Sequence, residues 1–190
     1  MFGLVLGLLE GKLVNLRAME REDIDFVAEH LNDINCIGEY WSDFEQQSKS
    51  ELMKQFDNPS NLVILLEAKE FIIQKKDGTR IGEIRHFLDK PHHLMEIACW
   101  LVPSESKKGY ATEATQLIVD YLFLSKEIAR IQAIVDVRHL ASQRVLEKAG
   151  FQREGTMRDE NFDRGAWRDF YLYSILRREW KEPKILTKSA

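Results

Sequence analysis

Two periods of hydrophobic and polar residues run along this chain, and together they predict a mixture of strands and helices. Alternation with a period of two, or a short apolar run, predicts strands over residues 13–19, 70–75, 80–88, 94–102, 130–137 and 170–176. Apolar residues three and four positions apart predict helices over residues 20–31, 48–56, 109–123 and 142–149. This order predicts a mixed α/β (α+β) fold, with a central, mostly antiparallel sheet and helices on its faces.

Turn and linker signals favour one domain. Lys76-Asp77-Gly78-Thr79 separates two predicted strands, and Asp-Gly is typical of a tight hairpin. Arg164-Gly165 predicts a second hairpin near the end of the chain. Of the 190 residues, 44% are hydrophobic and no Gly/Ser-rich linker or repeat interrupts them. We therefore expect a single domain over residues 1–190, with its core over about 11–180 and a frayed tail at 181–190.

The opening sequence MFGLVLGLLEG is apolar but does not resemble a membrane anchor. It is shorter than the roughly 20 apolar residues that a bilayer span needs, and it has neither a basic start nor a small-residue cleavage site. We expect an edge strand, or an arm packed on a neighbour. The second alternative is compatible with a homodimer.

Composition excludes several classes of partner and location. The chain carries 27 Lys and Arg against 31 Asp and Glu, without the basic excess typical of nucleic-acid binding. Cys36 and Cys99 are far apart in sequence, which indicates a reducing, cytoplasmic environment rather than a disulfide scaffold. Three histidines and one aspartate are candidate metal ligands, but a hairpin turn should separate them, so no metal is predicted. These residues are His86, Asp89, His92 and His93.

The stretch SKKGYATEA, residues 106–114, places two lysines and a glycine directly before a predicted helix. Backbone N–H groups at a helix start have no intrahelical acceptor, and the helix dipole adds positive charge, so such a corner can bind phosphate. Gly109 permits close approach, and Lys107 and Lys108 would add charge at the rim. The alternative is an ordinary helix start with solvated lysines. The sequence contains neither a GxxxxGK[ST] loop nor a three-glycine dinucleotide loop.

A family resemblance favours the phosphate-binding alternative. EIACWLVPSESKKGYATEA (96–114) followed by ASQRVLEKAGF (141–151) resembles the GNAT superfamily of N-acetyltransferases. The resemblance is closest to the RimJ/RimL-like branch, which acetylates the amino termini of ribosomal proteins. LVNLRAMEREDIDFVAEHLND (13–33) is similar to the first strand and helix of that branch, and GAWRDFYLYSILRREW (165–180) to its closing hairpin. The similarity covers most of the chain, in the expected order.

The resemblance implies acetyl-CoA as cofactor, with its pyrophosphate on a loop of pattern [QR]xxGx[GA] that falls here on residues 106–111. Ser106 replaces the usual Gln or Arg, and His139 stands where Asn is common. The strands 94–102 and 130–137 are expected to splay apart and admit the pantetheine arm near backbone groups of Leu101 and Val102. The implied cofactor-binding residues are Leu101, Val102, Lys107, Lys108, Gly109, Tyr110, Ala111, Thr112, His139, Ser142 and Arg144. Arg144 has an alternative partner in Glu147 or Glu154.

Two residues are candidates for proton transfer. Glu96 is the acid inside its strand and is the candidate base or water-mediated relay; the alternative is a surface carboxylate paired with Arg85 or a lysine. By resemblance Ser142 would assist the departing thiol, and its alternative role is a helix N-cap. A backbone N–H of the splayed strand would stabilise the oxyanion. Leu146 occupies the position where many members have a tyrosine acid, so that mechanism is not expected here.

The predicted function is transfer of an acetyl group to a primary amine. The acceptor is a protein amino terminus, or a small amine such as an aminoglycoside or a polyamine. Departures at Ser106, His139 and Leu146 leave a second alternative open, a non-catalytic module that binds or senses acyl-CoA. Acidic and aromatic side chains could line an acceptor site; the alternatives are a solvated surface for the acidic residues and core packing for at least half of the aromatic ones. These side chains are Glu39, Asp43, Glu45, Trp167, Phe170, Tyr171 and Tyr173.

Overall fold

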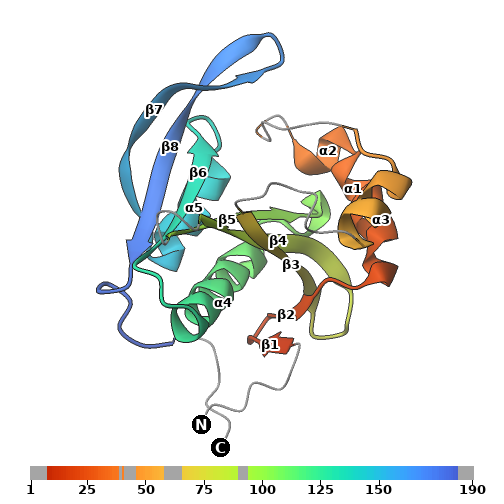
Figure 1. Ribbon diagram of the computed structural model, residues 1–190, viewed down its shortest axis with the longest axis horizontal. Coiled ribbons are helices and arrows are strands. Elements are labelled where there is room, and N and C mark those ends of the chain that lie inside the picture. Colours follow the sequence, from red (N-terminus) through yellow and green to blue (C-terminus); the bar gives the residue numbers. More distant parts are fainter. Residues whose placement is uncertain (1–7, 39, 41–45, 58–65, 90–93, 184–190) are drawn as a thin grey trace, which may run out of the picture.

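The computed structural model describes residues 8–38, 40, 46–57, 66–89 and 94–183, and these form one sheet with helices on both faces (Figure 1). The strand order is β1-β2-β3-β4-β5-β6-β8-β7. The strands are β1 (Leu8–Glu10), β2 (Val14–Ala18), β3 (Leu66–Lys75), β4 (Arg80–Asp89), β5 (Leu94–Leu101), β6 (Arg130–Asp136), β7 (Gln152–Asp163) and β8 (Ala166–Leu176). The helices are α1 (Ile24–Leu31), α2 (Ile34–Ile37), α3 (Lys49–Asp57), α4 (Tyr110–Ser125) and α5 (Leu140–Ala149).

All neighbouring strands pair antiparallel except β5 and β6, which are parallel. The expectation of a mostly antiparallel sheet in a mixed α/β fold is therefore confirmed. β1 is an edge strand beside β2, as one alternative for the apolar opening predicted. Residues 1–7 and 184–190 lie outside the described residues, so the arm, the tail and the homodimer stay predictions.

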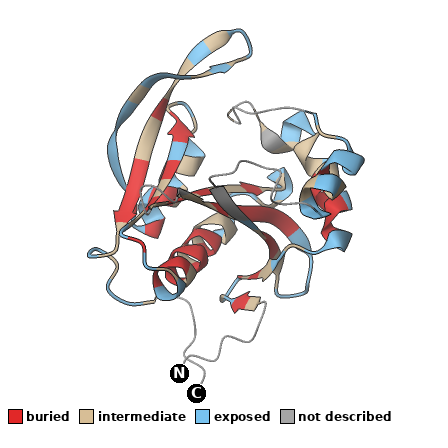
Figure 2. Cartoon of the chain, viewed as in Figure 1, coloured by how far each residue is buried: buried red, intermediate tan, exposed pale blue. Residues whose placement is uncertain are grey.

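One face of the sheet, the α4 face, carries the main hydrophobic core. Ile84 and Ile97 of the central strands are buried there against Leu117 and Ile118 of α4. Figure 2 shows this burial as a continuous red stripe on α4 beneath the sheet. The spacing of the apolar residues in α4 explains it, because positions three and four apart point toward the sheet. The helix predicted over residues 109–123 is confirmed.

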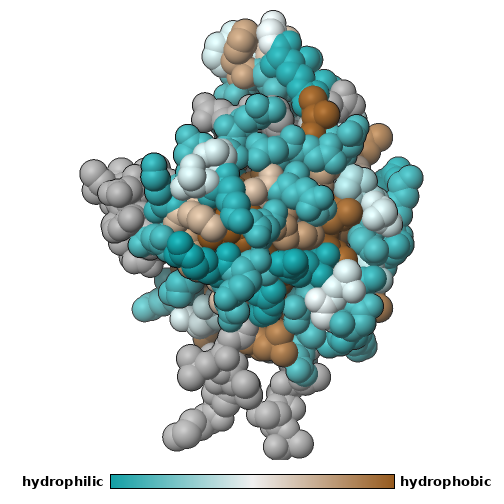
Figure 3. Space-filling model, turned by 90° about the vertical axis from the view of Figure 1, so that its right-hand side faces the viewer, coloured by the Kyte–Doolittle hydropathy of each residue, from teal (hydrophilic) through white to brown (hydrophobic). Residues whose placement is uncertain are grey.

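The opposite face of the sheet, the α1 face, has a smaller core and more polar residues. Ile72 of β3 and Trp100 of β5 are buried against Phe26 and Val27 of α1. The phenyl ring of Phe26 stacks on the Trp100 indole, with 5.7 Å between ring centroids. Figure 3 views the molecule from the side of α1 and α3, and most of the surface there is hydrophilic. The apolar contact between the sheet and the helices is therefore smaller on the α1 face than on the α4 face.

The β7–β8 hairpin extends beyond the rest of the sheet (Figure 1). Trp167 near its tip is exposed and packs edge-on against Phe162, at 5.4 Å between ring centroids. Phe170 and Tyr173, closer to the body, are buried. Core packing thus accounts for these two aromatic residues of β8, as one of the two alternatives predicted.

None of the helices within the described residues is long and apolar enough to cross a membrane. Cys36 and Cys99 are free thiols.

Candidate functional site

The strands β5 and β6 pair only at their first residues and then separate. The paired positions are Leu94 with Arg130, Met95 with Ile131 and Glu96 with Gln132. Beyond them β5 continues to Leu101 and β6 to Asp136 without pairing. The edges of both strands therefore present backbone N–H and C=O groups to the space between them. The splay expected from the family resemblance is present.

Leu101 and Val102 at the end of β5 differ in what they can offer a ligand. The N–H of Val102 donates to the carbonyl of Ile81 at 2.8 Å, and its carbonyl accepts from the N–H of Glu105 at 2.9 Å. The pairing with β4 thus continues one residue past the strand and engages both backbone groups of Val102, so its place near the pantetheine arm stays a prediction. Backbone groups alternate in direction along a strand, so those of Leu101 point toward β6 and into the splay.

The chain turns from β5 into α4 through residues 103–109, and this turn is the corner predicted to bind phosphate; it is called the phosphate corner below. Gly109 is the N-cap residue of α4, with φ of 89°, and Lys107 also has a positive φ of 63°. Left-handed residues so close together favour a backbone nest, in which N–H groups face one side. The first N–H groups of α4, at Tyr110, Ala111 and Thr112, have no intrahelical acceptor.

The corner is open to a ligand. Gly109 and both lysines are exposed, and Tyr110, Ala111 and Thr112 are half-buried. A Cβ atom on Gly109 would meet one described atom within 4 Å, the Leu13 Cδ1 at 3.5 Å. The space over the glycine is thus free for a phosphate, and the residues present fit the diphosphate of acetyl-CoA.

The two lysines of the corner differ in their partners. Lys108 forms an ion pair with Glu105 at 3.0 Å, and both lysine side chains are solvent exposed. We expect Lys107→Ala to weaken binding of coenzyme A by about 2- to 5-fold, because a surface charge near a helix terminus contributes about 0.3–1 kcal/mol. The loss should shrink as salt is raised, since exposed charges are screened. Calorimetric titration at low and at high salt measures both, and an effect that does not depend on salt would contradict an electrostatic role.

Glu113, one turn into α4, fixes the N-terminal strands against this corner. Its buried carboxylate accepts backbone hydrogen bonds from Lys12 at 3.0 Å, Leu13 at 2.6 Å and Val14 at 2.7 Å. A Cβ atom on Gly11 would lie only 2.7 Å from Oε2 of Glu113, so the turn needs glycine there. Because the carboxylate accepts from the backbone of residues 12–14, it does not occupy the N–H groups at the start of α4.

His139 is the N-cap residue of α5 and faces the region between α2 and β6. Its ring stacks on Tyr40, with 4.5 Å between centroids, and the guanidinium of Arg138 lies 5.4 Å from the Tyr40 ring. Burial lowers the pKa of His139, and the nearby Asp136 carboxylate opposes this shift. The imidazole of His139 thus stacks on an aromatic ring, whereas the Asn expected at this position from the family resemblance would form hydrogen bonds.

Ser142 is the third residue of α5 and not its cap. The helix begins at Leu140, with His139 as N-cap residue, so the N-cap role predicted for Ser142 is wrong. The sequence misled because Ser is a strong capping residue, while the start of the helix is set two residues earlier. Leu146 is buried in the main core, and Arg144 is exposed on the helix surface.

Glu96 lies where β5 and β6 begin to separate. Its Oε2 accepts a hydrogen bond from Nε2 of Gln132 at 2.9 Å, and its side chain is half-buried. Glu96 shares the α1 face with Ala98 and Trp100, because alternate residues of a strand point to the same side of the sheet. It is therefore close to any group that occupies the splay from this face.

A second carboxyl group on this face was missed from the sequence. Glu83 of β4 lies directly opposite Trp100 and is only 2% exposed. Burial, reinforced by the neighbouring Glu70, raises the pKa of Glu83 to about 7. The available signal was an acid between the isoleucines Ile81 and Ile84, but sequence alone does not show which strand lies beside it.

The other candidates do not form a site in the described residues. His86 is buried beside Phe71 and Tyr121 on the α4 face. His92 and His93 lie outside the described residues, as do Glu39, Asp43 and Glu45. Within residues 8–38, 40, 46–57, 66–89 and 94–183, no group of three or more His, Cys, Asp or Glu side chains could hold a metal ion.

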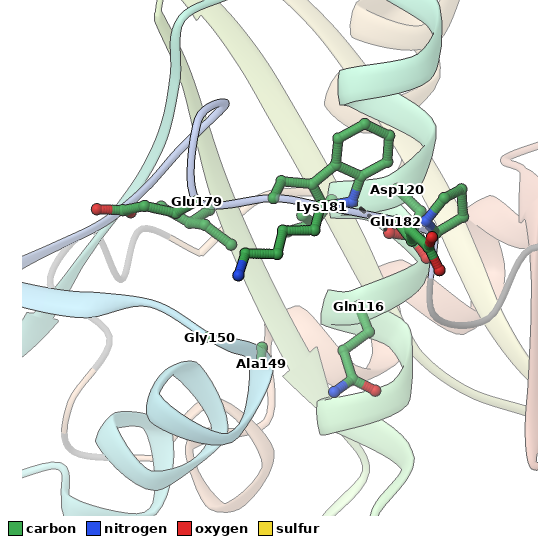
Figure 4. Close-up of a pocket in the computed structure, with 11 residues that line it drawn as sticks. Gln116, Asp120, Ala149, Gly150, Glu179, Lys181 and Glu182 are labelled. Carbon is green, nitrogen blue, oxygen red and sulfur yellow. Dashed lines mark hydrogen bonds between the residues drawn. The ribbon is translucent and has the colours of Figure 1, made fainter.

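Figure 4 shows a cavity of about 680 Å³ at the C-terminal end of α5, beside α4 and the segment that follows β8. The indole N–H of Trp180 donates to Asp120 there at 2.7 Å. Its lining includes none of residues 101–112. This cavity is therefore separate from the phosphate corner. The lining residues are Gln116, Val119, Asp120, Ala149, Gly150, Ile175, Glu179, Trp180, Lys181, Glu182 and Pro183.

Comparison with known proteins agrees with this geometry. Residues 14–152 match the model of the acetyltransferase (GNAT) domain. An uncharacterized N-acetyltransferase of Bacillus licheniformis is 32% identical over 171 residues, which cover 88% of this chain and 94% of the relative. Spermidine N(1)-acetyltransferase of Escherichia coli K12 is 27% identical over 172 residues, covering 88% of each.

A solved structure shows the same fold. RimL, a ribosomal alpha-N-protein acetyltransferase in complex with coenzyme A, matches with a TM-score of 0.77 at 17% identity, over 89% of this chain and 97% of RimL. The RimJ/RimL-like branch is compatible with these matches. With the amide corner, the splayed strands and a family model that spans most of its length, the chain belongs to the GNAT family of N-acetyltransferases, with acetyl-CoA as its cofactor.

Proposed function

We propose that this enzyme acetylates the amino terminus of a protein or peptide, with small polyamines as the second candidate acceptors. One observation carries the proposal: the phosphate corner and the splay lie at the same end of β5, joined by the short turn Pro103–Glu105. A diphosphate on the corner would direct the rest of the cofactor into the splay. A cytoplasmic site of action accords with the free thiols of Cys36 and Cys99.

Acetyl-CoA supplies an acetyl group activated as a thioester. The protein supplies position and electrostatics. The N–H groups at the start of α4 would hold the diphosphate, and the backbone of Leu101 would orient the pantetheine arm. A backbone N–H on the open edge of β5 would stabilise negative charge on the carbonyl oxygen in the transition state.

The two acceptor classes differ in the proton that must be removed. An α-amino group has a pKa near 8, whereas an alkylammonium such as a lysine side chain has a pKa near 10.4. The α-amine therefore needs less help from the enzyme at neutral pH. A polyamine acceptor is supported by the E. coli relative, whose name gives spermidine as its substrate, and a protein acceptor by the fold of RimL.

An assay of coenzyme A release tests the proposal. The enzyme and acetyl-CoA are incubated with peptides bearing free or blocked amino termini, with spermidine and with an aminoglycoside, and the free thiol is measured. We expect release with free amino termini and none with blocked ones. A thermal shift with acetyl-CoA but no turnover of any amine would instead favour a non-catalytic acyl-CoA-binding module.

Glu96 and Ser142 are proposed to assist proton transfer. We expect Glu96→Gln and Ser142→Ala each to lower kcat by about 10-fold or more while changing the affinity for acetyl-CoA by less than about 3-fold, because positioned proton-transfer groups contribute typically 100-fold or more. Steady-state kinetics and calorimetry on the same preparations separate the two quantities. Glu127→Gln, an exposed site after α4, is the control. Full activity in either variant would remove that residue from the mechanism.

A further inference from the structure

On the α1 face, β5 carries a small residue, Ala98, just beyond the point where β5 separates from β6. Across these strands Phe87 lies opposite Glu96, Arg85 opposite Ala98, and Glu83 opposite Trp100. Ala98 is half-buried and its methyl group leaves the sheet surface low between the longer side chains on either side. Diagonal neighbours on one face are about 7–8 Å apart, within reach of a long side chain. On β4 and β5, Glu83 and Glu96 are therefore the carboxyl groups that neighbour Ala98 on this face.

These two carboxyl groups have different surroundings. Glu96 is half-buried and accepts from Gln132. Glu83 is buried, and its Oε2 accepts from the Trp100 indole at 3.1 Å. Its other oxygen, Oε1, is buried and has no hydrogen-bond partner among the described residues. A buried acceptor without a donor is costly, so this oxygen is suited to receive an N–H group that arrives with a ligand.

We propose that Glu83 is the base that takes the first proton from the acceptor ammonium, and that Glu96 orients the amine over Ala98 and assists the later transfer of the second proton. This assignment rests on the proposed acetyltransferase function. Two acids at one site whose environments differ in this way are typical of a division of labour between proton transfer and positioning.

Two protons leave the acceptor nitrogen in this reaction. One N–H bond of the acceptor ammonium breaks, and its proton moves to Oε1 of Glu83. The nitrogen lone pair then forms the C–N bond to the thioester carbonyl carbon, and the C–S bond breaks with its electron pair on sulfur. A second proton from the nitrogen passes to the sulfur, giving the amide and a free thiol. Glu83 returns its proton to solvent after the products leave.

The electrostatic surroundings of Glu83 support the role. Its pKa of about 7 is raised by burial and by Glu70, and lowered by Arg85 and by the Trp100 hydrogen bond. Cys99 of β5 also lies near Glu83, and burial raises the pKa of that thiol to about 12, so it stays neutral. A carboxyl group of this pKa is ionised for much of the time at neutral pH and still accepts a proton readily.

Two further basic side chains, His30 of α1 and Arg80 of β4, lie near the aromatic cluster around Trp100. His30 stacks on the indole with 5.8 Å between ring centroids. The guanidinium of Arg80 lies 5.1 Å from the Phe26 ring, which itself stacks on Trp100, and Arg80 is paired with Asp23.

The test is the pH dependence of kcat/KM for one acceptor, measured in four proteins. We expect a decline in the wild type as the pH falls below about 7. Glu83→Gln should lower kcat by at least about 100-fold and abolish this decline. Glu70→Gln removes a negative neighbour and should shift the decline to lower pH, whereas Trp100→Phe removes a donor to the carboxylate and should shift it to higher pH. The affinity for coenzyme A should be unchanged in all three variants.

Several results would overturn the assignment. One is a kcat of Glu83→Gln within about 3-fold of the wild-type value. Another is a decline of kcat/KM at low pH whose midpoint is the same in Glu70→Gln, Trp100→Phe and the wild type.

The melting temperature of Glu83→Gln at pH 8 should equal or exceed that of the wild type, because the variant removes a buried charge. A ¹³C NMR titration of the Glu83 carboxyl group gives the same shifts without turnover, and a midpoint below pH 5 would also refute the role. If the wild type releases no thiol with any amine, the proposed acetyl transfer is refuted. The NMR midpoint tests the role of Glu83 separately, because it does not depend on turnover.

Discussion

Replacement of Gly109 by valine should weaken the binding of coenzyme A by at least about 100-fold. At φ of 89° the new side chain would project into the open space over the start of α4, where the phosphates are expected. Loss of two charge-assisted hydrogen bonds, at about 1.5–3 kcal/mol each, corresponds to a factor of 100 or more in affinity. Isothermal titration calorimetry of the wild type and the variant measures the ratio.

The same substitution at Gly78 is a matched control. Gly78 has φ of 85° in the turn between β3 and β4, and no described atom lies within 4 Å of an added Cβ. Both variants should lose about 1–2 kcal/mol of stability from left-handed strain, equivalent to a few degrees in melting temperature. Only Gly109→Val should lose affinity. Equal affinities in the two variants would show that the corner does not bind the cofactor.

Glu113→Gln should destabilise the protein by about 2–4 kcal/mol. The carboxylate accepts three backbone N–H groups from residues 12–14, and a neutral amide oxygen accepts fewer and weaker bonds while its NH₂ group faces a donor. At about 2–4 °C per kcal/mol for a chain of this size, the melting temperature should fall by roughly 5–15 °C. Thermal unfolding at low ligand concentration measures the change.

Hydrogen exchange locates the effect of this variant. The amides of Lys12, Leu13 and Val14 should exchange much faster in Glu113→Gln, while those of β8 keep their protection relative to global unfolding. Glu127→Gln, on the exposed segment after the same helix, should change neither property. Wild-type protection of residues 12–14 in Glu113→Gln would mean that the clamp contributes little.

The cofactor side of the site could be predicted from the sequence because its parts are local. A glycine and a helix start within the stretch 106–114 contain the whole phosphate corner, and helix geometry alone determines where the free N–H groups point. The faces of β5 also followed from period-two alternation, which placed Glu96 and Trp100 together. The family resemblance added the splay, which depends on a strand pairing about 36 residues apart in sequence.

The acceptor side could not be predicted in the same way because it depends on neighbours that are distant in sequence. Glu83 matters only because its strand lies beside β5 and its carboxyl reaches the Trp100 indole. Glu113 looked like an ordinary helix residue, and its three donors come from a turn about 100 positions earlier. The α2 helix is a single turn, too short to show a helical period. The N-cap role of Ser142 was misjudged because the helix begins two residues earlier than the pattern indicates.

The most direct measurement is a calorimetric titration of the wild-type protein with coenzyme A. If the start of α4 seats a diphosphate, one molecule should bind per chain with a Kd below about 100 μM, in the range of ordinary enzyme substrates, and Gly109→Val should abolish the heat. No heat with the wild type, or undiminished binding by Gly109→Val, would contradict this account of the site.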